Sequence, residues 1–233
     1  MQTIGMTTIG QSPRDDLVPY MEETFSRRVT VVQRGALDGL TCAEIAGLAP
    51  RPGQGTLVTR LRDGSEVALS YEAVLPRMQA AVDELTARGA ELLVVLCGAD
   101  WSALRSELLI VNPGQVFPAI VTALAKGRRL GVIKPSPAQV GGVERQFRER
   151  GIEAIGTAAS PYTGEARLEA ARQAAEALRA AKVDLVWMTC VGMDEPMRGV
   201  VREVTGKPVI LARSILSRVV DEFLVEPRVP ALV

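Results

Sequence analysis

The sequence of 233 residues contains no histidine, and this absence excludes several common kinds of catalytic site. A histidine base, a Ser-His-Asp triad, a Cys-His nucleophile pair and a histidine-bearing zinc site are all impossible. Any proton transfer must therefore use Cys, Asp, Glu, Lys or Tyr side chains. The three cysteines are odd in number and have no CxxC spacing, so we expect neither a metal site nor a secreted disulfide framework.

The chain also lacks an excess of charge and a long apolar run. Lys plus Arg and Asp plus Glu both number 27, which gives no reason to expect nucleic acid or a membrane surface as a partner. We find no uninterrupted apolar stretch of about 18 residues and no apolar leader segment. The sequence therefore predicts a cytoplasmic protein whose partner is a small molecule, and its length allows two lobes that share a cleft.

Short apolar runs alternate with amphipathic stretches along the chain, which is typical of βα units and a mostly parallel sheet. The apolar runs predict strands at residues 3–9, 29–32, 57–60, 92–96, 130–133, 152–155, 185–189 and 209–211. The amphipathic stretches predict helices at residues 15–26, 42–47, 71–88, 113–126, 137–150, 165–181, 195–205 and 212–223. A turn signal at residues 62–65 separates two β runs, and we expect a hairpin that interrupts the alternation there.

Two segments of the chain resemble each other, and each ends in a cysteine. When Cys97 is aligned with Cys190, alanines, acids and leucines of residues 81–97 match those of residues 174–190. Each copy has the pattern of a helix end, a short turn, a buried strand and then a thiol. Because ligands of open α/β folds bind at the carboxyl ends of strands, the repeat predicts two thiols that face one cleft. Such a pair can remove a proton from one face of a carbon and return one to the other face.

The residues after the two cysteines favour a functional role for both thiols. Gly98 follows Cys97, and Val191 and Gly192 follow Cys190, so that backbone N–H groups of the next helix could stabilise a thiolate. The structural alternative is that both cysteines fill space in a buried core, where free cysteines are common. The repetition of the pattern in two segments favours catalysis or binding.

The loop after the first predicted strand carries a second group of candidates. Gln11, Ser12 and Arg14 could bind a carboxylate together with backbone N–H groups of the loop. The same residues also suit an ordinary helix start, with Ser12 as the N-cap and Pro13 at the first helical position. Arg60 lies on a strand face that meets either an anionic substrate or solvent.

Further candidates follow later strands. Ser160 and Tyr162 lie between a predicted strand and a long helix, on the sheet edge of the cysteines, where their hydroxyl groups could bind substrate or cap the helix. Arg213 follows the last predicted strand and is a further candidate for the cleft. Cys42, by contrast, follows Thr41, which fits an N-cap, so we expect a packing role for this cysteine.

The chain resembles the AroM family over nearly its whole length. The segments that carry the resemblance are 8–16 (TIGQSPRDD), 36–40 (ALDGL) with Glu44-Ile45, 57–64 (LVTRLRDG), Cys97-Gly98, 159–162 (ASPY), 190–193 (CVGM) and 208–213 (PVILAR). That family in turn is similar to the wider aspartate/glutamate racemase superfamily, which includes hydantoin racemases, maleate isomerases and arylmalonate decarboxylases.

The resemblance implies an α/β fold of two pseudo-symmetric lobes with mostly parallel sheets and an active site in the cleft between them. We expect residues 1–112 and a C-terminal segment of about 207–233 to form one lobe, and residues 113–206 the other. The resemblance also implies that Cys97 and Cys190 exchange an α-proton without a cofactor. Amino-acid racemases usually have Cys-Asn-Thr and Cys-Thr-His at these positions, whereas here Cys97 precedes Gly-Ala-Asp and Cys190 precedes Val-Gly-Met.

We therefore expect a cofactor-independent racemase or epimerase that acts on a small carboxylate or hydantoin-like substrate, with Cys97 and Cys190 as opposed acid and base. One alternative is an isomerase or decarboxylase that uses a single cysteine, and another is a ligand-binding or regulatory protein without turnover. The sequence leaves the oligomeric state open, including a homo-oligomer. The residues predicted to bind the substrate are Gln11, Ser12, Arg14, Arg60, Gly98, Ser160, Tyr162, Val191, Gly192 and Arg213.

Overall fold

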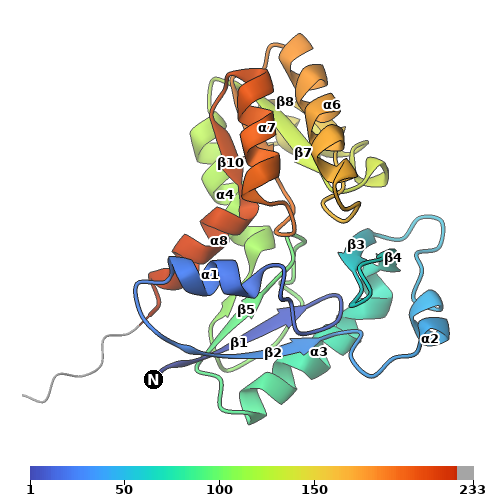
Figure 1. The fold of residues 1–233 in the computed structure, drawn as a ribbon, viewed down its shortest axis with the longest axis vertical. Helices are drawn as coiled ribbons and strands as arrows, with labels where there is room; N and C mark the ends of the chain where they lie inside the picture. The colour runs from blue at the N-terminus through green and yellow to red at the C-terminus, as the bar shows by residue number, and fades with distance from the viewer. Residues whose placement is uncertain (225–233) are drawn as a thin grey trace, which may run out of the picture.

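The computed structural model describes residues 1–224 and contains two four-stranded parallel sheets, one in each of two lobes (Figure 1). The first sheet has the order β2-β1-β5-β6 and the second the order β10-β9-β7-β8. When the strands of each sheet are counted along the chain, both sheets have the order 2-1-3-4. The predicted α/β class with mostly parallel sheets is therefore confirmed. The strands of the two sheets are β1 (Thr3–Thr8), β2 (Thr30–Gly35), β5 (Leu92–Val95), β6 (Ile110–Val111), β7 (Arg129–Lys134), β8 (Glu153–Ala158), β9 (Leu185–Met188) and β10 (Val209–Leu211).

Helices cover both sheets, and one antiparallel hairpin interrupts the alternation of strands and helices. The hairpin consists of β3 (Thr56–Arg60) and β4 (Glu66–Ser70), as predicted from the turn signal between them. It lies on the side of the first lobe that faces the second lobe (Figure 1). The helices are α1 (Val18–Thr24), α2 (Cys42–Ala46), α3 (Tyr71–Ala87), α4 (Pro113–Ala125), α5 (Val143–Arg148), α6 (Ala166–Ala180), α7 (Glu195–Thr205) and α8 (Ala212–Asp221).

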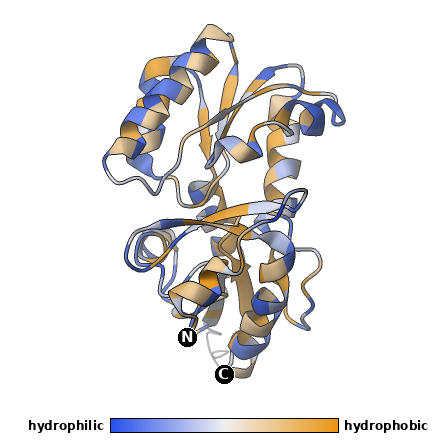
Figure 2. Cartoon of the chain, turned by 90° about the vertical axis from the view of Figure 1, so that its right-hand side faces the viewer, coloured by the Kyte–Doolittle hydropathy of each residue, from blue (hydrophilic) through white to orange (hydrophobic). Residues whose placement is uncertain are grey.

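Apolar side chains on the two faces of each sheet belong to different hydrophobic cores. In β5, Leu92 and Val94 point to one core and Leu93 and Val95 to another, because successive strand residues face opposite sides. The strands are accordingly hydrophobic, while the polar residues of the helices face outward (Figure 2). One of these cores contains residues of both sheets, and we call it the shared core. Its members include Ile4, Met6, Leu92, Val94, Phe117, Val121, Leu130, Val132, Phe147, Trp187, Leu216 and Val220.

The C-terminal segment connects the two lobes. The segment from about residue 207 was expected to belong to the first lobe, but β10 pairs in parallel with β9 and is a strand of the second sheet. That part of the expected boundary is wrong, because sequence periodicity does not reveal which strand is the neighbour. The following helix α8 packs against α1 of the first lobe. Residues 225–233 of the expected segment lie outside the described residues.

Most predicted elements are present, and the differences have local causes. Helix α1 begins at Val18 and not at residue 15, because residues 12–16 form a loop with side-chain contacts of its own. The helix predicted at 137–150 is divided into a short 3-10 turn and α5, with two glycines, Gly141 and Gly142, at the break. The two-residue strand β6 was not predicted, since it is too short to show a pattern.

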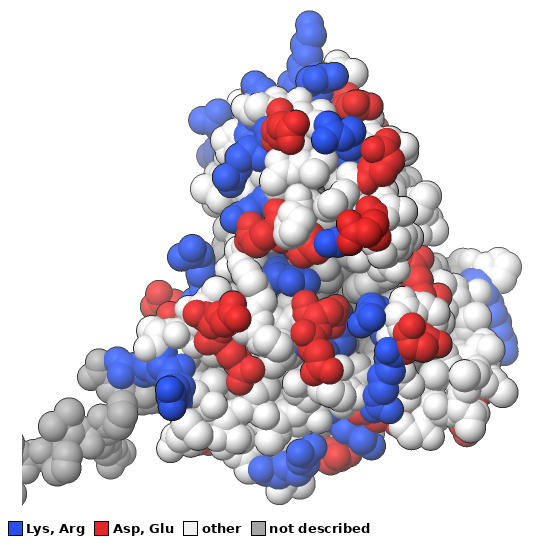
Figure 3. All heavy atoms as spheres, in the orientation of Figure 1, with Lys and Arg blue, Asp and Glu red and all other residues white. Residues whose placement is uncertain are grey.

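The described surface carries charges of both signs. Basic and acidic side chains are interspersed over both lobes on the face shown in Figure 3, in keeping with 27 residues of each kind in the sequence. Among residues 1–224, no helix is sufficiently long and apolar to cross a bilayer.

The aromatic part of the shared core gives a direct test of the packing. Phe147 is fully buried, and its ring lies edge-to-face against Trp187 with 6.0 Å between the ring centroids. We expect Phe147→Ala to lower the free energy of unfolding by about 3–5 kcal/mol, because the truncation leaves a cavity in a packed core. Urea denaturation measures this change. Leu124→Ala on α4 is the control, because Leu124 is 54% exposed and its truncation should change the free energy by less than about 0.5 kcal/mol. A loss below about 1 kcal/mol in Phe147→Ala would contradict the packing described here.

Candidate active site

A cavity of about 290 Å³ is lined by residues of both lobes, including Cys97 and Cys190. Cys97 follows β5 of the first sheet and Cys190 follows β9 of the second, which are the equivalent strands of the two lobes. Both strands run parallel to their neighbours, so their carboxyl ends deliver both thiols to the same space. Of the predicted site residues, Arg14, Gly98, Tyr162 and Val191 also line this cavity.

The loops that carry the two cysteines touch each other. A Cβ atom added to Gly98 would lie 2.8 Å from the carbonyl oxygen of Thr189, the residue before Cys190. A Cβ atom on Gly192 would lie 2.5 Å from the Tyr162 hydroxyl oxygen. Both glycines therefore permit an approach that any side chain would prevent. Gly192 itself does not line the cavity, but its lack of a side chain makes room for Tyr162.

Cys97 lies in an apolar environment that disfavours its thiolate. Burial raises the pKa of the Cys97 thiol to about 11, although the backbone N–H of Ala99 and the Trp101 indole act in the opposite direction. The sequence predicted that backbone N–H groups stabilise a thiolate at this position. The structure corrects this expectation, because the loss of solvation outweighs the single N–H group. Cys97 is therefore a protonated thiol at neutral pH.

Cys190 has a polar partner. The hydroxyl group of Tyr162 lies 3.6 Å from the Cys190 sulfur, within hydrogen-bond range for sulfur. Burial, and next the nearby Cys190, raise the pKa of Tyr162 well above its usual value, so the phenol keeps its proton. Tyr162 can therefore donate a hydrogen bond to the Cys190 sulfur. The two thiols thus have different surroundings on equivalent strands.

Arg14 is a buried cation whose charge is already compensated. Its Nε and one terminal nitrogen donate to the two carboxylate oxygens of Asp16, both at 2.8 Å, and the other terminal nitrogen donates to Thr8 Oγ1 at 3.1 Å. Burial by itself lowers the pKa of Arg14, but the Asp16 carboxylate outweighs burial, and the pKa is raised overall. The guanidinium therefore stays charged and lines the cavity, while most of its donors are in use.

Three other predicted residues of the first lobe do not line the cavity. The Ser12 hydroxyl donates to the buried Asp38 carboxylate and does not cap α1, so the alternative interpretation of Ser12 as an N-cap is wrong. The Gln11 side-chain oxygen accepts from the backbone N–H of Arg62. Gln11 and Arg60 line another hollow of about 190 Å³, which Arg14 also lines.

Two other predicted residues hold parts of the site in place. Arg213 is buried and donates to the carbonyl oxygens of Val191 and Gly192, both at 3.1 Å, so it fixes the loop after Cys190. Ser160 donates a short hydrogen bond to Glu66 of the β3–β4 hairpin in the other lobe. Neither residue lines the cavity.

The hairpin closes one side of the cavity. Residues 56–59 of β3 line it, and Gln139 of the second lobe donates to the Thr56 carbonyl oxygen at 2.8 Å. With the Ser160–Glu66 contact, this gives the hairpin two hydrogen bonds to the second lobe. The sequence predicted the hairpin but not its position over the cysteines.

Cys42, the third cysteine, neither lines the cavity nor is buried in a core. It is exposed at the first position of α2, so the expected packing role is wrong. Its neighbour Thr41 is the N-cap, as predicted, and forms a reciprocal capping box with Glu44. The predicted helix start is thus correct, but it places the thiol on the outer face.

Lys134 is a residue of the cavity that the sequence interpretation missed. It is the last residue of β7, and it lines the cavity next to the cysteines. Burial lowers the pKa of its ammonium group, and Cys190 acts in the opposite direction. It has no hydrogen bond or ion pair through its side chain with any residue of the described part of the chain. The signal in the sequence was its position directly after a buried strand, the same position that drew attention to the cysteines.

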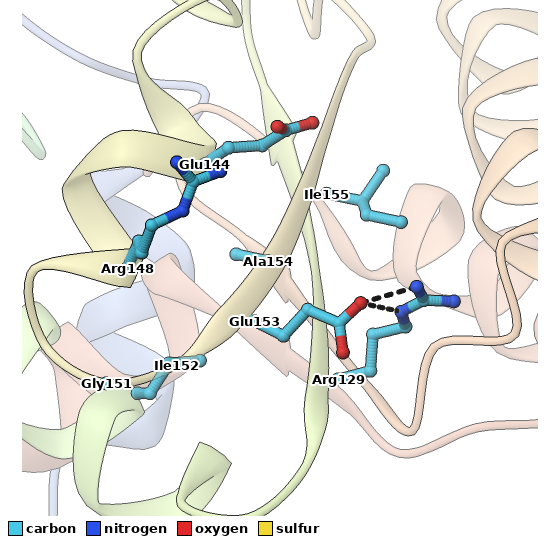
Figure 4. A pocket seen from close by; sticks show the side chains of 8 residues that line it. All are labelled: Arg129, Glu144, Arg148, Gly151, Ile152, Glu153, Ala154 and Ile155. Atoms are coloured by element: carbon cyan, nitrogen blue, oxygen red, sulfur yellow. Dashed lines mark hydrogen bonds and ion pairs between the residues drawn. The ribbon is translucent and has the colours of Figure 1, made fainter.

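A second hollow, of about 460 Å³, lies at the β8 edge of the second sheet (Figure 4). Its charged residues include Arg129 and Glu153, which pair with each other at 2.6 Å, and it contains neither a cysteine nor an aromatic side chain. The larger volume reflects an open surface hollow. We therefore assign the candidate site to the cavity with the two thiols. Within residues 1–224, no three His, Cys, Asp or Glu side chains are placed to hold a metal ion.

Alanine substitutions of two helical glycines test how tightly the loop after Cys97 is packed. A Cβ atom on Gly114 of α4 would lie 2.2 Å from the Ala99 carbonyl oxygen and 2.3 Å from the Asp100 Cα atom. We expect Gly114→Ala to lower the free energy of unfolding by about 1–3 kcal/mol, because backbone atoms of the loop must move. Gly199→Ala on α7 is the matched control, because nothing lies within 4 Å and alanine should stabilise that helix by up to about 1 kcal/mol. Equal urea midpoints for the two variants would contradict the close approach.

The fold is similar to those of several solved racemases and of a decarboxylase. An aspartate racemase from Picrophilus torridus gives a TM-score of 0.59 at 11% identity, covering 95% of this chain and 94% of that one. A glutamate racemase from Bacillus anthracis gives 0.56 at 14% identity, with 96% and 82% covered. An arylmalonate decarboxylase gives 0.56 at 15% identity, with 97% and 95% covered. At these identities the likeness concerns the fold.

Comparison at the level of sequence gives the family. No curated protein sequence matches this chain. The family described as AroM protein matches residues 4–224, which agrees with the resemblance predicted from the separate motifs. The chain belongs to the AroM family.

Proposed function

We propose that the protein is a cofactor-independent racemase or epimerase that uses Cys97 and Cys190 as a pair of acid and base. The observation that carries this proposal is that two equivalent strands, one in each lobe, deliver two thiols to a single cavity. The similar structures include enzymes named as racemases, which agrees with an isomerase. The substrate would be a small carboxylate or a hydantoin-like compound that fits about 290 Å³.

The different surroundings of the two thiols support a different starting role for each in this proposal. Cys97 is protonated because burial raises its pKa to about 11, so it begins as the proton donor. The Tyr162 hydroxyl lies within hydrogen-bond range of the Cys190 sulfur and can donate to it, so we assign the role of base to Cys190. Cys190 would take the proton from one face of the substrate carbon, while Cys97 returns its own proton to the other face. After turnover the protonation states are exchanged, and the reverse reaction follows the same steps.

The developing carbanion requires stabilisation at the reacting centre. The backbone N–H groups after each cysteine are candidates, because preorganised donors act strongly where water is excluded. Of the residues predicted to bind the substrate, Arg14, Gly98, Tyr162 and Val191 line the cavity, and of those predicted to bind its anionic group only Arg14 does so. Arg213 would contribute by holding the loop after Cys190, through its bonds to Val191 and Gly192.

A second candidate function is an isomerase or decarboxylase in which only one cysteine transfers a proton. The observation that favours it is the difference between the two thiols, since only Cys190 has a hydroxyl partner and Cys97 is held in the neutral form. A structure similar in fold is named as an arylmalonate decarboxylase. The two functions differ in whether both cysteines are essential.

Deuterium exchange distinguishes these functions. We expect the protein in D₂O to exchange the α-proton of at least one member of a panel of amino acids, hydantoins and 2-substituted carboxylates, as measured by NMR. Exchange should fall by at least about 100-fold in both Cys97→Ser and Cys190→Ser, because each thiol is needed for one face. Cys42→Ser is the control and should keep full exchange, since Cys42 is exposed outside the cavity.

The outcome separates the alternatives. Loss in only one of the two variants would favour the single-cysteine function. No exchange with any compound, together with unreactive thiols at neutral pH, would overturn the proposal and favour a ligand-binding protein.

The raised pKa of Cys97 gives a prediction that needs no substrate. Iodoacetamide reacts with the thiolate, and a pKa of about 11 in place of 9.0 lowers the thiolate fraction at neutral pH roughly 100-fold. We expect the alkylation rate of Cys97 to rise tenfold per pH unit from pH 7 to 10 without a plateau, as measured by peptide mass spectrometry. Exposed Cys42 in the same molecule reports the intrinsic reagent rate. A plateau for Cys97 below pH 9 would contradict the apolar environment.

A further inference from the structure

We infer that Lys134 binds the anionic group of the substrate, and that this substrate carries one negative charge beside an apolar group. The inference deepens the proposed function and rests on it in one respect, because the bound anion is a substrate only if the protein is an enzyme. The binding site itself can be tested without any turnover. No part of the sequence interpretation assigned a role to this lysine.

The sheet register places Lys134 one residue short of the level of the second thiol. Strands β7 and β9 are parallel neighbours, and Ile133 is the register partner of Met188. Thr189 follows and donates through both its backbone N–H and its hydroxyl to the Ile133 carbonyl oxygen. Lys134 and Cys190 therefore leave adjacent strands at the same edge, and both line the cavity. An anion held by Lys134 would lie beside the carbon that Cys190 must reach.

Charge compensation leaves Lys134 as the available cation. The other cation that lines the cavity, Arg14, has its charge matched by Asp16. The carboxylate of Asp100 also lines the cavity, but it accepts from the Ser102 N–H and the Asn112 amide, and within residues 1–224 it forms no ion pair with Lys134. A partly buried ammonium without a partner is costly, and an anionic ligand would offset this cost. Lys134 is therefore the lining cation with which one anionic group of a ligand can pair.

The apolar residues that line the cavity indicate the chemistry of the uncharged part of the ligand. Several apolar side chains from both lobes form the cavity wall, and a second charged group would lose its solvation against them. A volume of about 290 Å³ corresponds to on the order of ten water molecules at about 30 Å³ each, so the ligand is small. A singly charged carboxylate with an apolar substituent fits this wall better than a dicarboxylate does. The apolar lining residues include Ile9, Leu57, Val58, Leu96, Pro118 and Trp187.

Two alkylating reagents of similar size but different charge probe the site. Iodoacetate is an anion and iodoacetamide is neutral, and both react with the Cys190 thiolate. We expect Lys134→Gln to lower the iodoacetate/iodoacetamide rate ratio at Cys190 about tenfold, because the anion loses its cation. Lys134→Arg should keep most of the ratio. Lys126→Gln, at an exposed lysine outside the cavity, should leave the ratio unchanged.

The ratio also distinguishes an anion site from a direct effect on the thiol. If Lys134 only stabilised the Cys190 thiolate, both rates would fall in Lys134→Gln and their ratio would stay constant, which would overturn the inference. An unchanged ratio with unchanged rates would overturn it as well. Circular dichroism of the variants shows whether they fold, and Lys134→Arg gives a second test if Lys134→Gln does not.

Protection by carboxylates tests the charge and the apolar group of the ligand. We expect 3-methylbutanoate to slow iodoacetamide alkylation of Cys190 in the parent protein but not in Lys134→Gln, and succinate to protect at least tenfold more weakly. Equal or better protection by succinate would overturn the inference that the substrate carries only one negative charge. Protection of this kind without deuterium exchange would leave the anion site standing and overturn only the proposed racemase. If the parent protein exchanges the α-proton but Lys134→Gln changes neither the alkylation rates nor the protection, the proposed racemase would stand and the anion site would be overturned.

Discussion

The shared core is the feature on which the rest of the structure depends. It joins residues of both sheets with those of α4, α5 and α8, so neither lobe buries its apolar surface alone. Trp187 of β9 lies edge-to-face against Phe117 of α4 and Phe147 of α5, at centroid distances of 6.4 and 6.0 Å. Such packing has few alternative arrangements, since protein interiors are close-packed. The core therefore fixes how the carboxyl ends of β5 and β9 meet, and with them the two thiols.

Buried polar contacts then determine what lines the cavity. Asp38 accepts from the Ser12 N–H, the Gly35 N–H and the Arg62 guanidinium, and this holds the loop from which Arg14 enters the site. Arg213 holds the loop after Cys190 in the same way from the other lobe. These side chains are expensive to bury and are therefore hydrogen-bonded. Their role is to position groups that face the ligand.

The alternation of apolar and amphipathic stretches was sufficient to predict the α/β class, and the repeated pattern was sufficient to predict that both cysteines follow buried strands and face one cavity. Buried strands such as β5 and β9 have a strong local signal, and the residue after such a strand lies at a known edge of the sheet. The partners of polar side chains could not be predicted in this way. Ser12 and Arg60 have the composition of an anion site, yet Ser12 is bonded to Asp38, and Arg60 points to another hollow. Such partners are set by contacts between distant segments, which no local pattern records.

Equivalent backbones need not produce equivalent chemistry. The two sheets have the same strand order and present their thiols in the same way, but the groups around the thiols differ. Burial favours the neutral thiol at Cys97, whereas Cys190 has the Tyr162 hydroxyl within hydrogen-bond range and Lys134 at the end of the neighbouring strand. A racemase with chemically identical thiols would start from either protonation state with equal ease. In the proposed racemase, the buried and protonated Cys97 would therefore be the first proton donor, and the acidic C–H bond of the substrate would face Cys190.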